Sequence, residues 1–171
     1  MVFKNSQHNS VSENANTDIV VWDDKYKCGI ALVDTQHREL IKLTNQLYRA
    51  CFGGNEAANN AFSEAMSRMV EYVRFHFSTE QEMLKRINYP DYQDHKAKHD
   101  VLIKDILHAA EEYKMGKKFV PNQFVRTLKD WIFSHIAITD KLYAYYIAEQ
   151  KKKGLLSDQQ INGLTSIKSV K

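Results

Sequence analysis

Four segments of this chain repeat apolar residues every three or four positions, which is the spacing that gives an α-helix one hydrophobic face. Short runs of helix-breaking residues separate these segments, at Gly53-Gly54, Asn88-Tyr89-Pro90 and Gly116. Four hydrophobic helix faces have to be buried against one another, and a helical bundle does this.

The helix-breaking residues set the expected ends of the helices. The helices are predicted from about Thr35 to Cys51, from about Asn60 to Ile87, from about Asp91 to Gly116, and from Pro121 onwards. Asp34 is the predicted N-cap of the first helix. In the fourth helix, the predicted buried stripe includes Ile138 and Leu142. Because the connections are short, consecutive helices should be antiparallel neighbours, and the predicted fold is an all-α, up-down-up-down four-helix bundle.

Composition divides the chain into a domain and two tails. Residues 1–17 contain little to bury and are predicted to form a flexible tail. Residues 151–171 are predicted to form a polar, basic tail in which a short helix, outside the bundle, can follow Ser157. The domain is expected at residues 18–150, beginning with an ordered arm whose Trp22 docks on the bundle. With 171 residues, 43% of them hydrophobic, one globular domain is the expected size.

Charge and hydropathy exclude some classes of partner. The formal charge of +3 comes from 24 basic and 21 acidic residues spread along the chain, so no strong field favours nucleic acid. No segment approaches the roughly 18 apolar residues of a membrane span, and the first residues lack the apolar stretch of a signal peptide. We therefore expect a cytoplasmic protein, and a monomer.

The predicted core faces also contain ionisable residues. A single buried histidine is more often a core residue hydrogen-bonded to a backbone carbonyl than a metal ligand. Five imidazoles and a carboxylate without any Lys or Arg on the same faces need a shared partner, since burying them unpaired is costly. A multivalent cation would satisfy them together. These residues are His37, His76, Glu80, His95, His99 and His135.

Local spacing supports a metal site on two of the helices. His76 and Glu80, like His95 and His99, are four residues apart, so each pair lies on one helix face and can reach one metal. Asp140 follows His135 by five residues, which places it about 140° away around a regular helix. Periodicity leaves two alternatives for Asp140: a surface residue, or a ligand presented by a locally widened, π-helical turn.

As a set, these residues resemble the hemerythrin family, and specifically its single-domain bacteriohemerythrins, over about residues 20–147. The resemblance rests on Trp22, on the run Gly29-Ile-Ala-Leu-Val-Asp-Thr-Gln-His37, and on three spaced pairs: His76-x-x-x-Glu80, His95-x-x-x-His99 and His135-x-x-x-x-Asp140. It favours Asp140 as a ligand. His8 and His108 match no ligand position.

The resemblance implies a non-haem centre of two iron ions. One iron would bind His95, His99 and His135, and the other His37 and His76. Glu80 and Asp140 would bridge the two, together with a solvent-derived oxo or hydroxo group. If both irons are octahedral, one position stays open, on the iron with two histidines. The apolar candidates for the wall of the dioxygen pocket are Leu40, Phe77, Leu102, Trp131, Ile132 and Ile136.

The implied function is reversible dioxygen binding for storage, delivery or sensing, without catalysis, with a separate protein as a potential recipient. An open ferrous site also suits a second hypothesis, a di-iron oxidase, a peroxidase-like enzyme or a protein that handles nitric oxide. A third hypothesis is an interaction module in which the histidines are structural and the basic C-terminal tail binds a partner.

Overall fold

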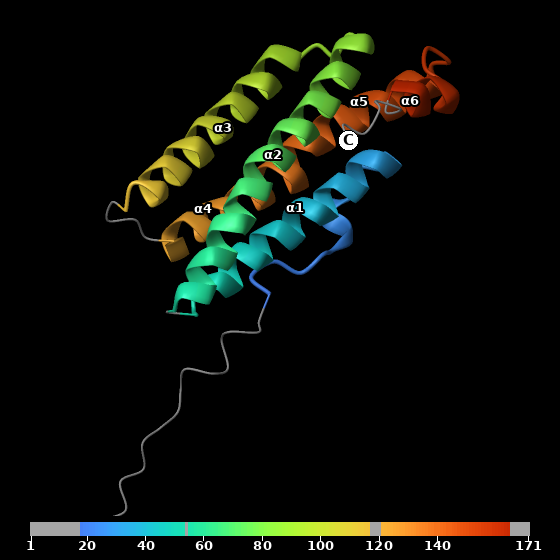
Figure 1. The fold of residues 1–171 in the computed structure, drawn as a ribbon. Coiled ribbons are helices and arrows are strands. Elements are labelled where there is room, and N and C mark those ends of the chain that lie inside the picture. Colours follow the sequence, from blue (N-terminus) through green and yellow to red (C-terminus); the bar gives the residue numbers. More distant parts are fainter. Residues whose placement is uncertain (1–17, 54, 117–120, 165–171) are drawn as a thin grey trace, which may run out of the picture.

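The computed structural model describes residues 18–53, 55–116 and 121–164, and all regular structure in these ranges is helical. The main helices are α1 (Ala31–Ala50), α2 (Glu56–Arg86), α3 (Tyr92–Lys114), α4 (Pro121–Ser134) and α5 (Asp140–Lys152). A π-helical turn, η3 (His135–Thr139), joins α4 to α5, so these two helices form one rod beside α1, α2 and α3 (Figure 1). The predicted four-helix bundle is confirmed. None of the described helices is both long and apolar enough to cross a membrane.

Two predicted helix starts are wrong, because both helices begin earlier in the chain than expected. Helix α1 begins at Ala31, and Asp34 lies inside its first turn. The Asp34 carboxylate accepts hydrogen bonds from the preceding backbone N–H groups of Cys28 and Gly29, at 2.7 and 3.2 Å, and so orders the loop before the helix. Helix α2 begins at Glu56, because the Asn55 side chain accepts from the N–H of Ala58 and acts as the N-cap.

The predicted stripe of the fourth helix is wrong after His135. Ile138 and Leu142, expected in the core, are 54% and 52% exposed. The π turn adds a residue to one turn of the helix and rotates everything that follows, so that Asp140, Tyr143 and Ile147 face the core instead. The same rotation selects the π-helical alternative for Asp140, which is fully buried.

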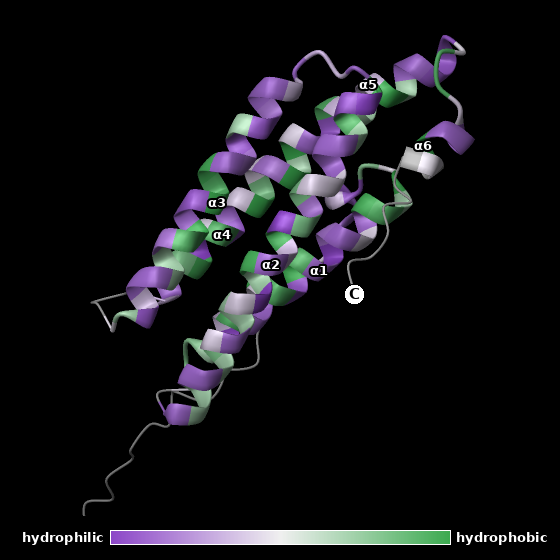
Figure 2. Ribbon diagram, turned by 45° about the horizontal axis from the view of Figure 1, so that its top comes forward, coloured by the Kyte–Doolittle hydropathy of each residue, from purple (hydrophilic) through white to green (hydrophobic). Residues whose placement is uncertain are grey.

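The core consists of two apolar clusters with a polar layer between them. On α2 one cluster ends at Phe77 and the other begins at Met83; on α1 the corresponding residues are Leu40 and Val33. Predicted ligands lie in this gap on every helix, and His76 and His135 lie at its edge, beside Phe77 and Ile136 of the first cluster. Hydrophobic and hydrophilic residues alternate along the helices in Figure 2, as expected for helices with one buried and one exposed face. A polar layer enclosed by apolar residues at both ends is shielded from bulk water.

The segment before α1 packs along the outside of that helix, as the arm was predicted to do (Figure 1). Asn45 of α1 holds it by two buried hydrogen bonds: its side-chain oxygen accepts from the N–H of Val20, and its side-chain amide donates to the carbonyl of Val20. Trp22 is half-buried against the core, with the Arg38 guanidinium 4.1 Å from the centre of one of its rings. The arm then forms a short 3₁₀ helix, η2 (Asp24–Tyr26).

The short helix that the sequence allows after Ser157 is present as α6 (Asp158–Leu164), but contrary to expectation it does not lie wholly outside the bundle. Its Ile161 is buried in the same apolar cluster as Met83 and Tyr143 and covers one end of the bundle. The predicted flexible tail at 1–17 lies outside the described residues, and the domain limits at 18 and 150 stay predictions.

Candidate metal centre

Each helical rod contributes at least one of the seven predicted ligands to the polar layer. All seven are buried, and Glu80, Asp140, His37, His76 and His99 have no exposed surface. The regular helices α2 and α3 present their pairs through four-residue spacing. His135 and Asp140 point to the same place only because the π turn η3 lies between them. The sequence-predicted residues therefore meet at one place in the fold.

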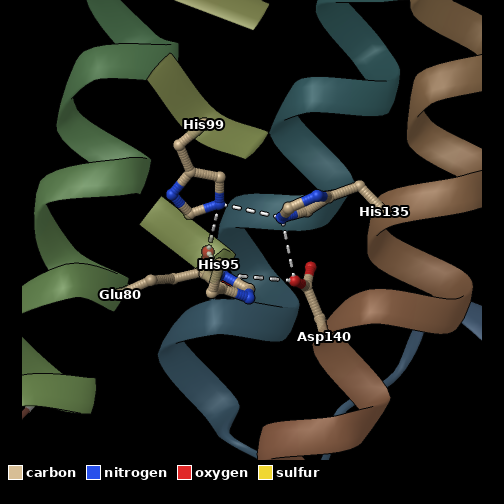
Figure 3. A group of neighbouring side chains, drawn as sticks. All are labelled: Glu80, His95, His99, His135 and Asp140. Atoms are coloured by element: carbon tan, nitrogen blue, oxygen red, sulfur yellow. Dashed lines mark hydrogen bonds and ion pairs between the residues drawn. The ribbon is translucent and has the colours of Figure 1, made fainter. Parts of the chain in front are cut away.

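The side chains converge on two overlapping groups that share Glu80. The larger contains Glu80, His95, His99, His135 and Asp140, and offers one ligand atom from each residue, all within 4.8 Å of one another (Figure 3). The smaller contains His37, His76 and Glu80 within the same limit. His37 Nε2 is also 3.3 Å from Asp140 Oδ2. Both carboxylates thus stand between two sets of imidazoles.

Several atoms aimed into this layer have no hydrogen-bond partner. They are the Nε2 atoms of His37, His76 and His95, one oxygen of Glu80 and both oxygens of Asp140. Buried polar atoms without partners are rare in folded proteins and destabilise them by roughly 1–3 kcal/mol each. Imidazole nitrogens and carboxylate oxygens are ligands for divalent transition metals. The donor set therefore fits metal ions.

The spacing between donors fits the same interpretation. His99 Nε2 and His135 Nε2 are 2.8 Å apart, and His135 Nε2 is 3.2 Å from Asp140 Oδ1. Two bonds of about 2.1 Å at right angles on one metal place their donor atoms about 3 Å apart. Two lone pairs would repel each other at 2.8 Å, but a shared cation between them removes the conflict.

Without a metal, a proton on His37 compensates part of the negative charge of the two buried carboxylates. Burial alone would lower the pKa of His37, but the nearby negative carboxylates of Asp140 and Glu80 raise it to about 10. Burial lowers the pKa of His76 to about 3 and that of His99 to about 4, although Glu80 opposes both shifts. Burial also opposes ionisation of Glu80, yet the surrounding histidines hold its pKa well below the usual value. The carboxylates therefore stay charged, and a bound cation would displace the proton from His37.

Three residues that contact the ligands were not predicted. The Gln36 amide faces His76, and the Tyr26 backbone carbonyl lies 3.2 Å from His37 Nδ1. The Tyr143 hydroxyl donates to Glu80 Oε1 at 2.5 Å, and burial raises its pKa well above the usual value, so the phenol stays a donor. Gln36 directly precedes a predicted ligand, and Tyr143 follows Asp140 by one helical turn. Their closeness in sequence to predicted ligands was the signal that could have identified these two residues.

Aromatic rings cover the three-histidine group. The Phe77 ring is stacked on His99, with centroids 3.6 Å apart and an angle of 1° between the planes. The Trp131 ring is stacked on His135 at 4.3 Å and 11°. Five of the six predicted wall residues are buried and belong to the apolar cluster on this side, and Trp131 is half-buried against it.

The other two histidines lie elsewhere. His108 is exposed on α3 beside Glu112, as expected for a residue without a role in the site. His8 lies outside the described residues.

Comparison with known proteins connects this site to a family. The family model described as "Hemerythrin HHE cation binding domain" matches residues 28–147. The bacteriohemerythrin of Stenotrophomonas maltophilia (strain R551-3) is 31% identical over 126 residues, which cover 74% of this chain and 80% of the relative. The bacteriohemerythrin of Pseudomonas aeruginosa (strain LESB58) is 26% identical over 147 residues, covering 86% and 93%.

A solved structure shows the same architecture. The crystal structure of wild-type hemerythrin superimposes with a TM-score of 0.69 at 25% identity, covering 74% of this chain and 95% of that one. The family match spans all seven converging residues of the polar layer. This chain belongs to the hemerythrin family.

Proposed function

We propose that this protein binds dioxygen reversibly at a centre of two non-haem iron ions. His95, His99 and His135 would hold one iron, and His37 and His76 the other. Glu80 and Asp140 would bridge them, with a solvent-derived oxo or hydroxo group as a third bridge. A reduced di-iron centre would supply electrons to dioxygen on binding and recover them on release. Membership of the hemerythrin family supports this proposal.

The observation that carries the proposal is the set of unpartnered buried donors on both sides of the two carboxylates. One group contributes three imidazoles and the other two, while Glu80 belongs to both. With shared carboxylates, two octahedral ions would be coordinated unequally, and the ion with two histidines would keep a free position. That asymmetry is what a site for one small ligand requires.

The surroundings support a small, neutral ligand. Leu40, Phe77, Ile132 and Ile136 are buried beside the polar layer and contribute only apolar surface. Such a wall admits a diatomic molecule and keeps out bulk water and larger reductants. Neutral imidazoles also dominate the donor set, unlike the Glu-x-x-His pairs of carboxylate-rich di-iron proteins.

The test has two stages. Elemental analysis of the purified protein should give about two irons per chain, as the two donor groups require. The anaerobically reduced protein should then gain new absorption bands on exposure to air and lose them on degassing. A protein without iron would overturn the proposal. Repeated consumption of peroxide, nitric oxide or a reductant would instead support the enzymatic alternative.

The proposal also includes a cytoplasmic monomer whose metal-binding domain spans residues 18–150. Light scattering on the intact protein tests the oligomeric state, and cell fractionation tests the location. A chain truncated after residue 150 tests the boundary. If it retained both irons but melted at a lower temperature, α6 would be a stabilising cover and not part of the site.

A further inference from the structure

A buried chain of hydrogen bonds runs from the backbone of α2 through α1 to one of the proposed ligands. The Thr79 hydroxyl donates to the carbonyl of Phe75 at 3.0 Å, and the Gln36 amide donates to the Thr79 oxygen at 3.2 Å. The Gln36 carbonyl oxygen lies 3.1 Å from His76 Nδ1. Gln36 and Thr79 are each 1% exposed, so water does not compete for these contacts.

The direction of each hydrogen bond follows from the one before it. A backbone carbonyl can only accept, so the Thr79 hydroxyl donates its single hydrogen to the carbonyl of Phe75. The Thr79 oxygen is then left to accept from the Gln36 amide nitrogen, which turns the Gln36 oxygen towards His76. That oxygen can only accept, so the hydrogen of neutral His76 sits on Nδ1 and the lone pair on Nε2. His76 Nε2 is one of the unpartnered atoms aimed into the metal centre.

We propose that Gln36 is a positioning residue for the open iron: it selects the metal-binding tautomer of His76 and, as a neutral acceptor, sets how strongly that imidazole donates to the metal. This inference rests on the proposed function. His37, the other histidine assigned to the same iron, also faces a neutral acceptor, the backbone carbonyl of Tyr26. With metal bound, an uncharged oxygen acceptor at each position would leave both side chains as neutral imidazole ligands.

The strength of the acceptor has a predictable effect on the metal. An acceptor on the far nitrogen of a ligating histidine raises the basicity of the ligand, and a carboxylate does so more than an amide. A more basic imidazole stabilises the ferric state. Replacement of Gln36 by Glu should therefore lower the reduction potential of the centre, and replacement by Leu should raise it.

The experiment compares Gln36→Leu, Gln36→Glu and a matched control, Thr44→Val. Thr44 is also fully buried on α1, but its hydroxyl bonds only to the carbonyl of Leu40 and to no proposed ligand. Iron-free protein is titrated with Co²⁺, whose absorption spectrum reports binding without oxygen chemistry. The site with two histidines should fill second, because it has fewer ligands. Gln36→Leu should weaken this second binding step by about 10–100-fold. Thr44→Val should bind as wild type does, and Gln36→Glu should bind at least as tightly, because a carboxylate acceptor makes the imidazole a stronger donor.

The second measurement is the reduction potential of the iron-loaded proteins. We expect a lower potential for Gln36→Glu than for wild type, and a higher one for Gln36→Leu. Equal Co²⁺ affinities in Gln36→Leu and Thr44→Val, or one potential shared by all variants, would overturn the inference. Equal weakening of both Co²⁺ steps would show a merely structural role. Wild-type protein that binds two Co²⁺ but gives no reversible oxygen spectrum would contradict the proposed function. The Co²⁺ titrations would still test the role of Gln36.

Discussion

On the two-histidine side of the centre, the Nδ1 atoms of His37 and His76, which point away from the centre, face hydrogen-bond acceptors. These acceptors are the backbone carbonyl of Tyr26 and the side-chain oxygen of Gln36. On the three-histidine side, the rings of His99 and His135 are instead stacked on Phe77 and Trp131. There, the polar contact to His99 Nδ1 is a long one, from Gln81 at 3.5 Å. One group is held mainly by directional contacts and the other mainly by packing.

The difference separates two kinds of control over a metal. A hydrogen bond determines which nitrogen carries the proton and how basic the ligand is, whereas stacking determines only the plane of the ring. Under the proposed assignment, the iron that binds dioxygen lies on the hydrogen-bonded side. Its properties depend on the arm and on Gln36, while those of the other iron depend on the core. Mutations should therefore affect the two sides separately, except at the shared carboxylates.

The largest effect is expected from Glu80→Gln, because Glu80 belongs to both donor groups. The substitution keeps the volume of the side chain but removes the negative charge, and it should abolish binding of both irons. Elemental analysis measures the loss. Glu82→Gln is the control, since Glu82 lies on the same helix and pairs with Arg86 in solvent. Retention of two irons by Glu80→Gln would show that the carboxylate is not shared.

Phe77→Ala should act on the stacked side. It leaves a cavity against His99 and should destabilise the iron-free protein by about 3–5 kcal/mol, measured by denaturant unfolding. Phe62→Ala, on the same helix and in the same apolar cluster, should cost a similar amount without touching a ligand. Only Phe77→Ala should also weaken the first Co²⁺ step. Identical Co²⁺ titrations for the two variants would mean that stacking does not position His99.

Asn45→Leu should act on the hydrogen-bonded side through the arm. It removes both hydrogen bonds to Val20 and leaves the buried backbone groups of that residue unpaired, which destabilises the arm by about 1–3 kcal/mol. Backbone amides of residues 20–30 should exchange with solvent faster, and the second Co²⁺ step should weaken because the Tyr26 carbonyl moves. Thr44→Val is again the control. Fast exchange with unchanged Co²⁺ binding would show that His37 does not need the arm.

The smallest effect expected is a pH dependence shared by the two sides. The pKa values of His76 and His99 are lowered to about 3 and about 4 in the folded, iron-free protein, so the unfolded chain binds protons that the folded one does not. Stability should therefore fall as the pH drops from about 6.5 towards 4, by on the order of 1 kcal/mol per histidine over the first pH unit. His37 acts in the opposite direction, because its raised pKa keeps it protonated in the folded protein while the unfolded side chain gains its proton only as the pH falls through about 6.5. It therefore offsets part of the loss over the first pH unit. Denaturant unfolding at several pH values measures the slope, and His76→Gln should remove about half of it.

Much of the site could be predicted because it rests on local geometry. A four-residue spacing places two side chains on one helix face whatever the rest of the protein does, so His76 with Glu80 and His95 with His99 followed from periodicity alone. Burial of His37 and His135 followed from their position in apolar stripes. These predictions needed only the regular helix.

The remaining features depend on contacts between helices and on departures from regular geometry. The π turn rotates Asp140 into the core and Ile138 and Leu142 out of it, and no local spacing distinguishes that turn from a regular one. Gln36 meets His76 only because α1 and α2 pack side by side. The sequence by itself determined four helices and six buried, ionisable residues that call for a cation. Periodicity left Asp140 open and only the family resemblance favoured it, so tertiary packing was needed to place it among them. Packing also decided which Nδ1 atoms meet a hydrogen-bond acceptor, because both features depend on how one helix is rotated against its neighbours.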